Sequence, residues 1–119
     1  MPAEIAILGA GPVGCTLALL MQRAGRAVRV LERRPRSAPP APPRPIALSY
    51  ASRLILERAG AWGMLATTSI ETVHVAQAGR LGCTRLDCRE LGLPALGYVI
   101  DYSALAQALA ACVEASGIE

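Results

Sequence analysis

Three glycines near the start of the chain have the spacing of a turn that binds a pyrophosphate. Gly9, Gly11 and Gly14 stand in the segment GAGPVG, between a short apolar run and an apolar pattern of helical period. The first glycine permits a tight turn, the second lets a pyrophosphate approach the main chain, and the third lets helix and strand pack closely. The following helix offers unpaired N–H groups to phosphate oxygens, and Pro12 in its first turn loses no hydrogen bond. We therefore expect these glycines, Pro12 and Val13 to form a phosphate-binding turn.

A single carboxylate, Glu32, follows this turn at the end of a second apolar run. An acidic side chain at that point can accept hydrogen bonds from both ribose hydroxyls of an adenosine. The same carboxylate repels a 2′-phosphate, so the nucleotide is predicted not to be NADP. A glycine-rich turn without a ligand is the alternative, but the strand before it, the helix after it and the distance to Glu32 favour a dinucleotide site.

A strand, a helix and a second strand must position these groups. The continuous apolar run at residues 4–8 predicts a parallel strand that is covered on both faces. A helix follows and ends at Gly25, and residues 27–31 predict the second strand. The apolar residues expected on one face of the helix are Val13, Leu17, Leu20 and Met21. We predict a right-handed βαβ core at residues 3–34, and hence an α/β, Rossmann-like FAD- or NAD(P)-binding domain with a parallel sheet.

The next segment, residues 35–45, contains six prolines and predicts a crossing loop, because no helix or central strand tolerates that density. Residues 46–119 complete the single domain expected for 119 residues. A helix is expected there from a Ser49 cap to Gly60, with an inward face that consists of Ala51, Leu54, Ile55 and Ala59.

Three further elements are expected towards the end of the sequence. Residues 71–76 alternate as a half-buried strand, which residues 81–86 extend to a small β-hairpin insertion. A short strand is expected at residues 97–100. Ser103 is expected to cap a last helix that ends at Gly117. The residues expected to face the core from this helix are Leu105, Leu109, Cys112 and Val113.

The charge pattern favours an anionic ligand but not a nucleic acid. The chain has a formal net charge of +3, and seven arginines against one acid stand between Arg23 and Arg44. Such a local excess suits a phosphate group or an anionic surface, although a solvated edge would look the same. Aromatic residues make up only 3% of the chain, so the rings that stack on nucleic-acid bases are scarce.

Other residue types argue against metal, hydrolase and membrane-spanning classes. The four cysteines form no Cys-x-x-Cys pair and His74 is the only histidine, so neither a zinc site nor a Ser-His-Asp set can be assembled. We expect His74 to be exposed and Cys15 to be a small buried residue. The apolar N-terminal run carries Glu4 and is interrupted by glycines and a proline, unlike a signal peptide or a membrane span.

Three stretches of the sequence resemble the N-terminus of the FAD-dependent aromatic hydroxylases, and in particular the ubiquinone-biosynthesis hydroxylases of the 2-octaprenyl-6-methoxyphenol hydroxylase type. The first is ILGAGPVGCTLALLMQRAGRAVRVLERR, which many flavoproteins share. The second is RPIALSYASRLILERAGAW, and the third combines ETVHVAQAGRLG with ALGYVIDYSALAQAL. The last two stretches are more specific than the first, and they carry the resemblance to this family.

The resemblance implies an FAD site and a reaction. Gly9, Gly11 and Gly14 would line the pyrophosphate, and Glu32 would hold the ribose. Arg33 would flank the adenine side, and Arg44 would reach FAD from the end of the proline-rich loop. Residues around Tyr102 and Leu105 would lie near the cofactor. In such enzymes NAD(P)H reduces the flavin, oxygen reacts with it, and a hydroxyl group passes to a small aromatic substrate, here a polyprenylated ring.

The family also implies what this chain lacks. Its members are much longer and carry a second FAD motif of the Gly-Asp type, a dipeptide that does not occur here. We therefore expect a truncated N-terminal portion that binds the ADP half of FAD and does not hydroxylate a substrate by itself. Exposed strand edges and the Leu105/Leu109 helix predict an apolar patch and self-association. The implied location is the cytoplasm, with peripheral contact of the parent enzyme at the inner membrane.

Two other functions are compatible with the same fingerprint. An NAD-dependent oxidoreductase shares the glycine turn and Glu32, but it gives no reason for the segment that begins at Arg44. A non-catalytic domain that binds ADP-like ligands is the second alternative.

Overall fold

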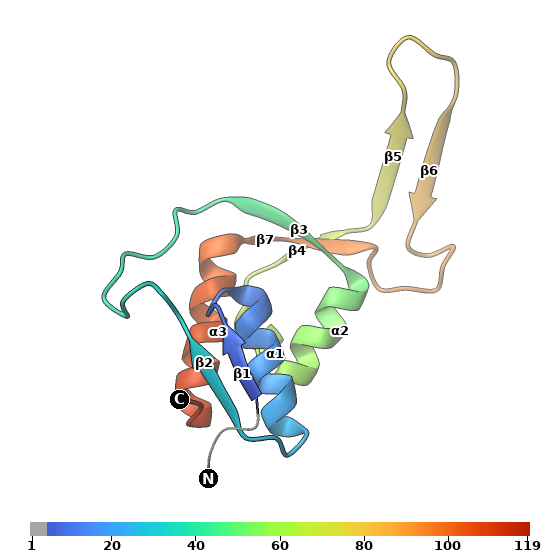
Figure 1. Ribbon diagram of the computed structural model, residues 1–119. Helices are drawn as coiled ribbons and strands as arrows, with labels where there is room; N and C mark the ends of the chain where they lie inside the picture. Colours follow the sequence, from blue (N-terminus) through green and yellow to red (C-terminus); the bar gives the residue numbers. More distant parts are fainter. Residues whose placement is uncertain (1–4) are drawn as a thin grey trace.

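A strand, a helix and a parallel strand begin the computed structural model, which describes residues 5–119 (Figure 1). They are β1 (Ile5–Leu8), α1 (Pro12–Arg23) and β2 (Val28–Leu31). The two strands pair in parallel, with Ile5 opposite Val28. This confirms the predicted βαβ arrangement, although residues 3 and 4 lie outside the described residues.

Only one face of this strand pair is covered in the described part of the chain. Ile7 is buried against the helices, whereas Leu8 on the opposite face is 81% exposed and Leu31 is also exposed. The expectation of strands covered on both faces is therefore wrong for these residues. Side chains alternate between the two faces of a strand, and the helices pack against one of them.

The buried face of α1 also differs from the prediction. Cys15, Ala18 and Leu19 are buried, whereas Val13 is 84% exposed and Leu17 is also exposed. Most residues of α1 are apolar, so the apolar pattern alone does not fix which side faces inward. Small side chains at positions 15 and 18 let the helix approach its neighbours closely.

A second sheet lies beside this unit and contains two strands that the sequence did not indicate. Its order is β3 (Pro45–Ser49), β7 (Gly97–Asp101) and β4 (Thr68–Ile70), and both pairings are antiparallel. The central strand β7 confirms the strand predicted at residues 97–100. Pro45 is tolerated because it is the first residue of an edge strand, where a missing N–H donor costs little.

Helix α2 (Tyr50–Ala59) begins and ends where the sequence predicts. The hydroxyl of Ser49 accepts a hydrogen bond from the main-chain N–H of Ser52 at 3.1 Å, and Gly60 has a left-handed φ of +82°. Its buried residues are Leu56 and Ala59. The predicted inward residues Ala51, Leu54 and Ile55 are exposed, so most of the predicted face is wrong. A short 3-10 helix, η1 (Trp62–Met64), follows, and its Trp62 packs edge-on against Tyr98.

Helix α3 (Tyr102–Ser116) packs beside α1 and completes the core. Its cap is Asp101 rather than the predicted Ser103, and Gly117 ends it with a left-handed φ of +74°. Leu105 and Leu109 are buried, as predicted. They therefore cannot form the exposed apolar patch that was also expected of them. Beyond α3, the main-chain oxygen of Glu119 accepts a hydrogen bond from the N–H of Val30 at 2.8 Å, so the end of the chain lies along β2.

The predicted hairpin is formed by β5 (Thr72–Ala76) and β6 (Cys83–Asp87), and it projects away from the body (Figure 1). It is not half-buried as expected, because almost all of its residues are exposed in the described chain. His74 is exposed, as predicted.

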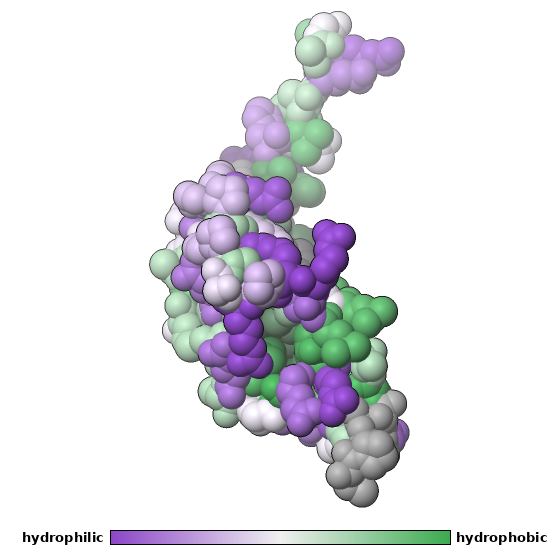
Figure 2. All heavy atoms as spheres, turned by 60° about the vertical axis from the view of Figure 1, so that its left-hand side comes forward, coloured by the Kyte–Doolittle hydropathy of each residue, from purple (hydrophilic) through white to green (hydrophobic). Residues whose placement is uncertain are grey.

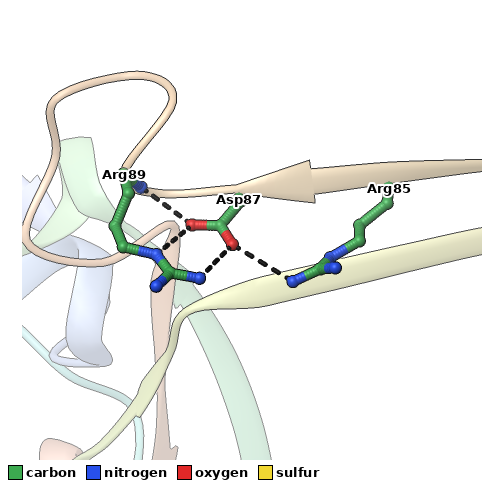
Figure 3. Close-up of polar contacts among 3 residues, drawn as sticks. All are labelled: Arg85, Asp87 and Arg89. Atoms are coloured by element: carbon green, nitrogen blue, oxygen red, sulfur yellow. Dashed lines mark hydrogen bonds and ion pairs between the residues drawn. The ribbon is translucent and has the colours of Figure 1, made fainter.

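The base of this hairpin is held by Asp87, which is only 6% exposed. Its carboxylate accepts hydrogen bonds from the main-chain N–H of Arg89 at 3.0 Å and from the Arg89 guanidinium at 3.0 and 2.8 Å (Figure 3). Arg85 adds a longer contact of 3.3 Å. These contacts, led by the Arg89 side chain, hold the pKa of Asp87 well below its ordinary value. The carboxylate is therefore ionised at neutral pH.

Candidate functional site

The glycine-rich turn between β1 and α1 has free space beside its main chain at Gly11 and a close main-chain contact at Gly14. Gly9 has a left-handed φ of +104°, and its N–H donates to the oxygen of Leu31 at 2.7 Å. A Cβ added at Gly14 would lie 1.9 Å from the main-chain oxygen of Gly9, so only glycine fits there. A Cβ at Gly11 would meet nothing within 4 Å. The turn therefore packs tightly against itself at Gly14 and presents bare backbone at Gly11.

Glu32 points back towards this turn from the end of β2. Its Oε2 accepts a hydrogen bond from the main-chain N–H of Ala10 at 2.7 Å, and its Oε1 accepts one from Arg34 at 2.9 Å. These bonds, that from Arg34 first, lower the pKa of Glu32 below its ordinary value. The carboxylate is thus charged at neutral pH and is oriented by the main chain.

A cavity of about 580 Å³ opens beside the turn and Glu32. Its walls are the N-terminus of α1, the end of β2, the proline-rich loop and one side of α3. Figure 2 shows the side of the molecule on which β2 and the proline-rich loop come forward, with hydrophilic side chains beside a hydrophobic patch. This cavity brings together polar main chain, the Glu32 carboxylate and the side chains of Arg34 and Arg36.

Arg34 is exposed, and its side chain forms part of the wall of the cavity. Its guanidinium donates to the main-chain oxygen of Pro39 at 2.7 Å, and Arg34 itself lines the cavity. Arg33 is exposed next to Glu32 and does not line the cavity. The proline-rich loop is therefore tied to the strand end that it follows.

Arg44 lies at the far end of the same loop. Its guanidinium carbon stands 4.4 Å from the centroid of the Tyr102 ring, which is a cation–π distance. Tyr102 lines the cavity beside the glycine turn, whereas Arg44 lines a second cavity of about 360 Å³ together with Val99 and Asp101. Leu105, which the resemblance placed near the cofactor, is buried in the core and lines neither cavity.

Helix α3 forms one wall of the larger cavity, with residues that were not among the predicted site residues. Ala106 and Ala110 face the cavity one turn apart, and Gln107 and Glu114 lie on the same side. The alanines at positions 106 and 110 were a usable signal, because small residues four positions apart form a flat helix face.

Cys15 is buried at the start of α1, as predicted, and its thiol donates to the main-chain oxygen of Ala10 at 3.3 Å. Burial, and to a lesser degree the charge of Glu32, raise the pKa of this thiol. Cys15 is therefore a protonated packing residue rather than an activated nucleophile.

Residues 5–119 contain no group of three or more His, Cys, Asp or Glu side chains that could hold a metal ion. No helix in the same range is both long and apolar enough to cross a membrane.

Comparisons with known proteins agree on one family. A family described as an FAD binding domain matches residues 2–118. The 3-demethoxyubiquinol 3-hydroxylase of Escherichia coli K12 is 37% identical in an alignment 133 residues long. The alignment covers 96% of this chain and 31% of that protein. The ubiquinone hydroxylase UbiM of Neisseria meningitidis serogroup C is 35% identical over 63% of this chain and 17% of its own length. The chain thus spans about a third or less of these relatives.

Solved structures share the fold. The tetrameric form of 2-methyl-3-hydroxypyridine-5-carboxylic acid oxygenase superposes with a TM-score of 0.74 at 20% identity, over 100% of this chain and 31% of the other. The peptidyl tryptophan dihydroxylase QhpG has a TM-score of 0.61 at 24% identity, over 100% of this chain and 24% of its own. At these identities the likeness is one of fold.

Proposed function

This chain belongs to the family of FAD-binding domains, and from that premise we propose that residues 1–119 hold the ADP half of FAD in a flavin-dependent aromatic-ring hydroxylase. The observation that carries the proposal is the ionised Glu32 carboxylate, which is hydrogen-bonded to the glycine turn and lines a cavity of about 580 Å³ together with Ala10 and Gly11. A carboxylate beside a bare main-chain turn suits the ribose and the pyrophosphate of one nucleotide.

The residues present fit an FAD pyrophosphate. The main chain at Gly11 is open, and the neighbouring N–H groups at the start of α1 lie at the positive end of the helix dipole. We assign the pyrophosphate contacts to the turn residues, which are Gly9, Gly11, Pro12, Val13 and Gly14. Gly14 acts by keeping the turn closed against Gly9, so that the open main chain faces the ligand.

The sugar and the remainder of the cofactor would be held by charged residues. Glu32 would accept from the ribose hydroxyls, because its charge and orientation are already set by main-chain N–H groups. Arg33 would flank the adenine side from its exposed position next to Glu32. Arg44, stacked on Tyr102, would reach FAD from the end of the proline-rich loop.

Bound FAD would supply the redox chemistry, with NAD(P)H as reductant and oxygen as co-substrate. Two curated relatives are named for the hydroxylation of ubiquinone or its precursor, which supports a polyprenylated aromatic substrate for the whole protein. The chain covers 31% of the first of these relatives, and we infer that most substrate-binding residues of the whole protein lie outside the segment that matches this chain. A quinone-type substrate also favours a cytoplasmic enzyme that touches the membrane surface.

Calorimetry of the 119-residue chain with FAD, ADP and NAD tests this proposal. We expect ADP and FAD to bind in the same affinity range, FAD the more tightly, and NAD to bind more weakly than FAD. The Glu32→Ala variant should weaken both favoured ligands. Preferential binding of NAD would instead support a dehydrogenase-type domain, and binding of ADP without any gain for FAD would support a non-catalytic ADP-binding domain.

A further inference from the structure

Asp101 joins the end of the proline-rich loop to the start of α3. Its Oδ1 accepts hydrogen bonds from the main-chain N–H of Arg44 at 3.0 Å and of Ser103 at 3.1 Å. Its Oδ2 accepts from the hydroxyl of Ser103 at 2.8 Å. One carboxylate therefore ties residues 57 positions apart in the sequence and caps a helix at the same time.

These contacts fix the main chain of Arg44 on both sides. Its N–H donates to Asp101, and its oxygen accepts from the N–H of Tyr102 at 2.9 Å. The Arg44 guanidinium then lies over the Tyr102 ring. The loop before Arg44 is rich in proline and has no helix or strand, so the Asp101 carboxylate and the Tyr102 N–H together hold the point where it ends.

The Asp101 carboxylate is suited to this task at neutral pH. The hydroxyl of Ser103, followed by the main-chain N–H groups of Arg44 and Ser103, lowers the pKa of Asp101 below its ordinary value. An ionised acceptor makes stronger hydrogen bonds than a neutral one, so the link to Arg44 is of the stronger kind.

Resting on the proposed function, we propose that Asp101 is a positioning residue that directs Arg44 towards the part of FAD beyond its ADP half. Two observations carry this inference. Arg44 does not line the cavity that contains Glu32, but it stacks on Tyr102, which does. Arg44 and Asp101 instead line a second cavity of about 360 Å³, so Arg44 meets the lining of the first cavity through Tyr102.

The test compares FAD with ADP by calorimetry on the full chain. Asp101→Ala removes the acceptor for Arg44 and should weaken FAD binding by about fivefold, the worth of one hydrogen bond, while ADP affinity stays within about twofold. Asp101→Asn retains an oxygen that can accept from Arg44 and can cap α3, so it should restore most of the FAD affinity. An equal loss for both ligands in Asp101→Ala would overturn the proposal.

A double-mutant cycle then asks whether Asp101 acts through Arg44. Arg44→Ala should lower FAD affinity by itself, and adding Asp101→Ala to it should cause no further loss. Full additivity of the two losses would show that Asp101 contributes independently of Arg44, and the positioning role would be wrong.

Ser49→Ala is the matched control for the loss of a helix cap. It removes the cap of α2, and neither Ser49 nor α2 lines either cavity, so the ratio of FAD to ADP affinity should stay unchanged. Amide hydrogen exchange without ligand provides a separate readout, because Asp101→Ala should expose the Arg44 N–H to exchange and Ser49→Ala should not. If the Arg44 N–H stays equally protected in Asp101→Ala, the positioning role of Asp101 is refuted, whether or not a nucleotide binds. If neither FAD nor ADP binds the wild-type chain, only the proposed function is refuted.

Discussion

Glu32 at the end of β2 accepts a hydrogen bond of 2.7 Å from the main-chain N–H of Ala10, in the turn that follows β1. This bond brings the carboxylate of one strand to the glycine-rich turn of the other. The parallel pairing of β1 and β2 makes the approach possible, because the carboxyl ends of parallel strands lie at the same edge.

Replacing the Glu32 carboxylate should separate binding from folding. Glu32→Ala should weaken ADP and FAD binding by at least about tenfold, since hydrogen bonds to a charged group are lost. Calorimetry measures the loss, and circular dichroism should show that the helices remain. Unchanged affinity for both nucleotides would contradict the role given to Glu32.

The same residue predicts a pH dependence of stability. Its pKa is lowered in the folded chain by the N–H groups of Arg34 and Ala10, so its stabilising contribution is fully present above the ordinary glutamate pKa. That contribution is lost as the pH falls through the lowered value. Urea unfolding of the wild type and of Glu32→Gln across acidic pH should show the difference between them shrinking as the pH drops. A difference that grows on acidification would show the opposite linkage.

Two glycines of the turn should respond to the same substitution in opposite ways. Gly14→Ala forces a Cβ against the Gly9 oxygen and should destabilise the chain by about 1–3 kcal/mol, as overpacking does. Gly11→Ala has free space and an ordinary φ, so it should fold normally and lose nucleotide affinity. Thermal unfolding and calorimetry on both variants check this pair, and equal stability of the two would mean that the turn is not closed at Gly14.

Asp87 should control the base of the hairpin rather than nucleotide binding. Asp87→Asn leaves the Arg89 guanidinium without its charged partner, so the amides of β5 and β6 should exchange faster, with the rest of the chain unaffected. Arg85→Ala removes a single contact of 3.3 Å and should have a much smaller effect. Exchange that rises equally in α1 would indicate global rather than local loosening.

Self-association of the chain should depend on the outer face of β1 rather than on α3. Leu8 and Leu31 are exposed side by side at the paired ends of β1 and β2. Leu8→Gln should lower the concentration-dependent mass measured by sedimentation, because it removes apolar surface from this face. Leu54→Gln on α2, which is also exposed, serves as the control. An equal effect of both variants would point to unspecific association.

Local signals in the sequence were sufficient for much of the fold. The left-handed glycines Gly60 and Gly117, the Ser49 cap and the hairpin depend on residues close together in the chain. The glycine turn and Glu32 were recognisable because their spacing reflects a requirement of the backbone.

Features that depend on distant partners were not predictable in the same way. Strands β3 and β4 exist because β7 lies between them, and neither has a strong strand pattern of its own. The inward faces of α1 and α2 were set by which neighbours they pack against. The link between Asp101 and Arg44 spans 57 positions, and no local sequence motif predicts it.

The most direct test of the account is a titration of the isotopically labelled chain with ADP, followed by the amide resonances of the main chain. We predict that the largest shifts fall on Gly9, Gly11 and Gly14 and on residues next to Glu32, with the hairpin of β5 and β6 unchanged. Shifts concentrated elsewhere, with the glycine turn silent, would contradict it.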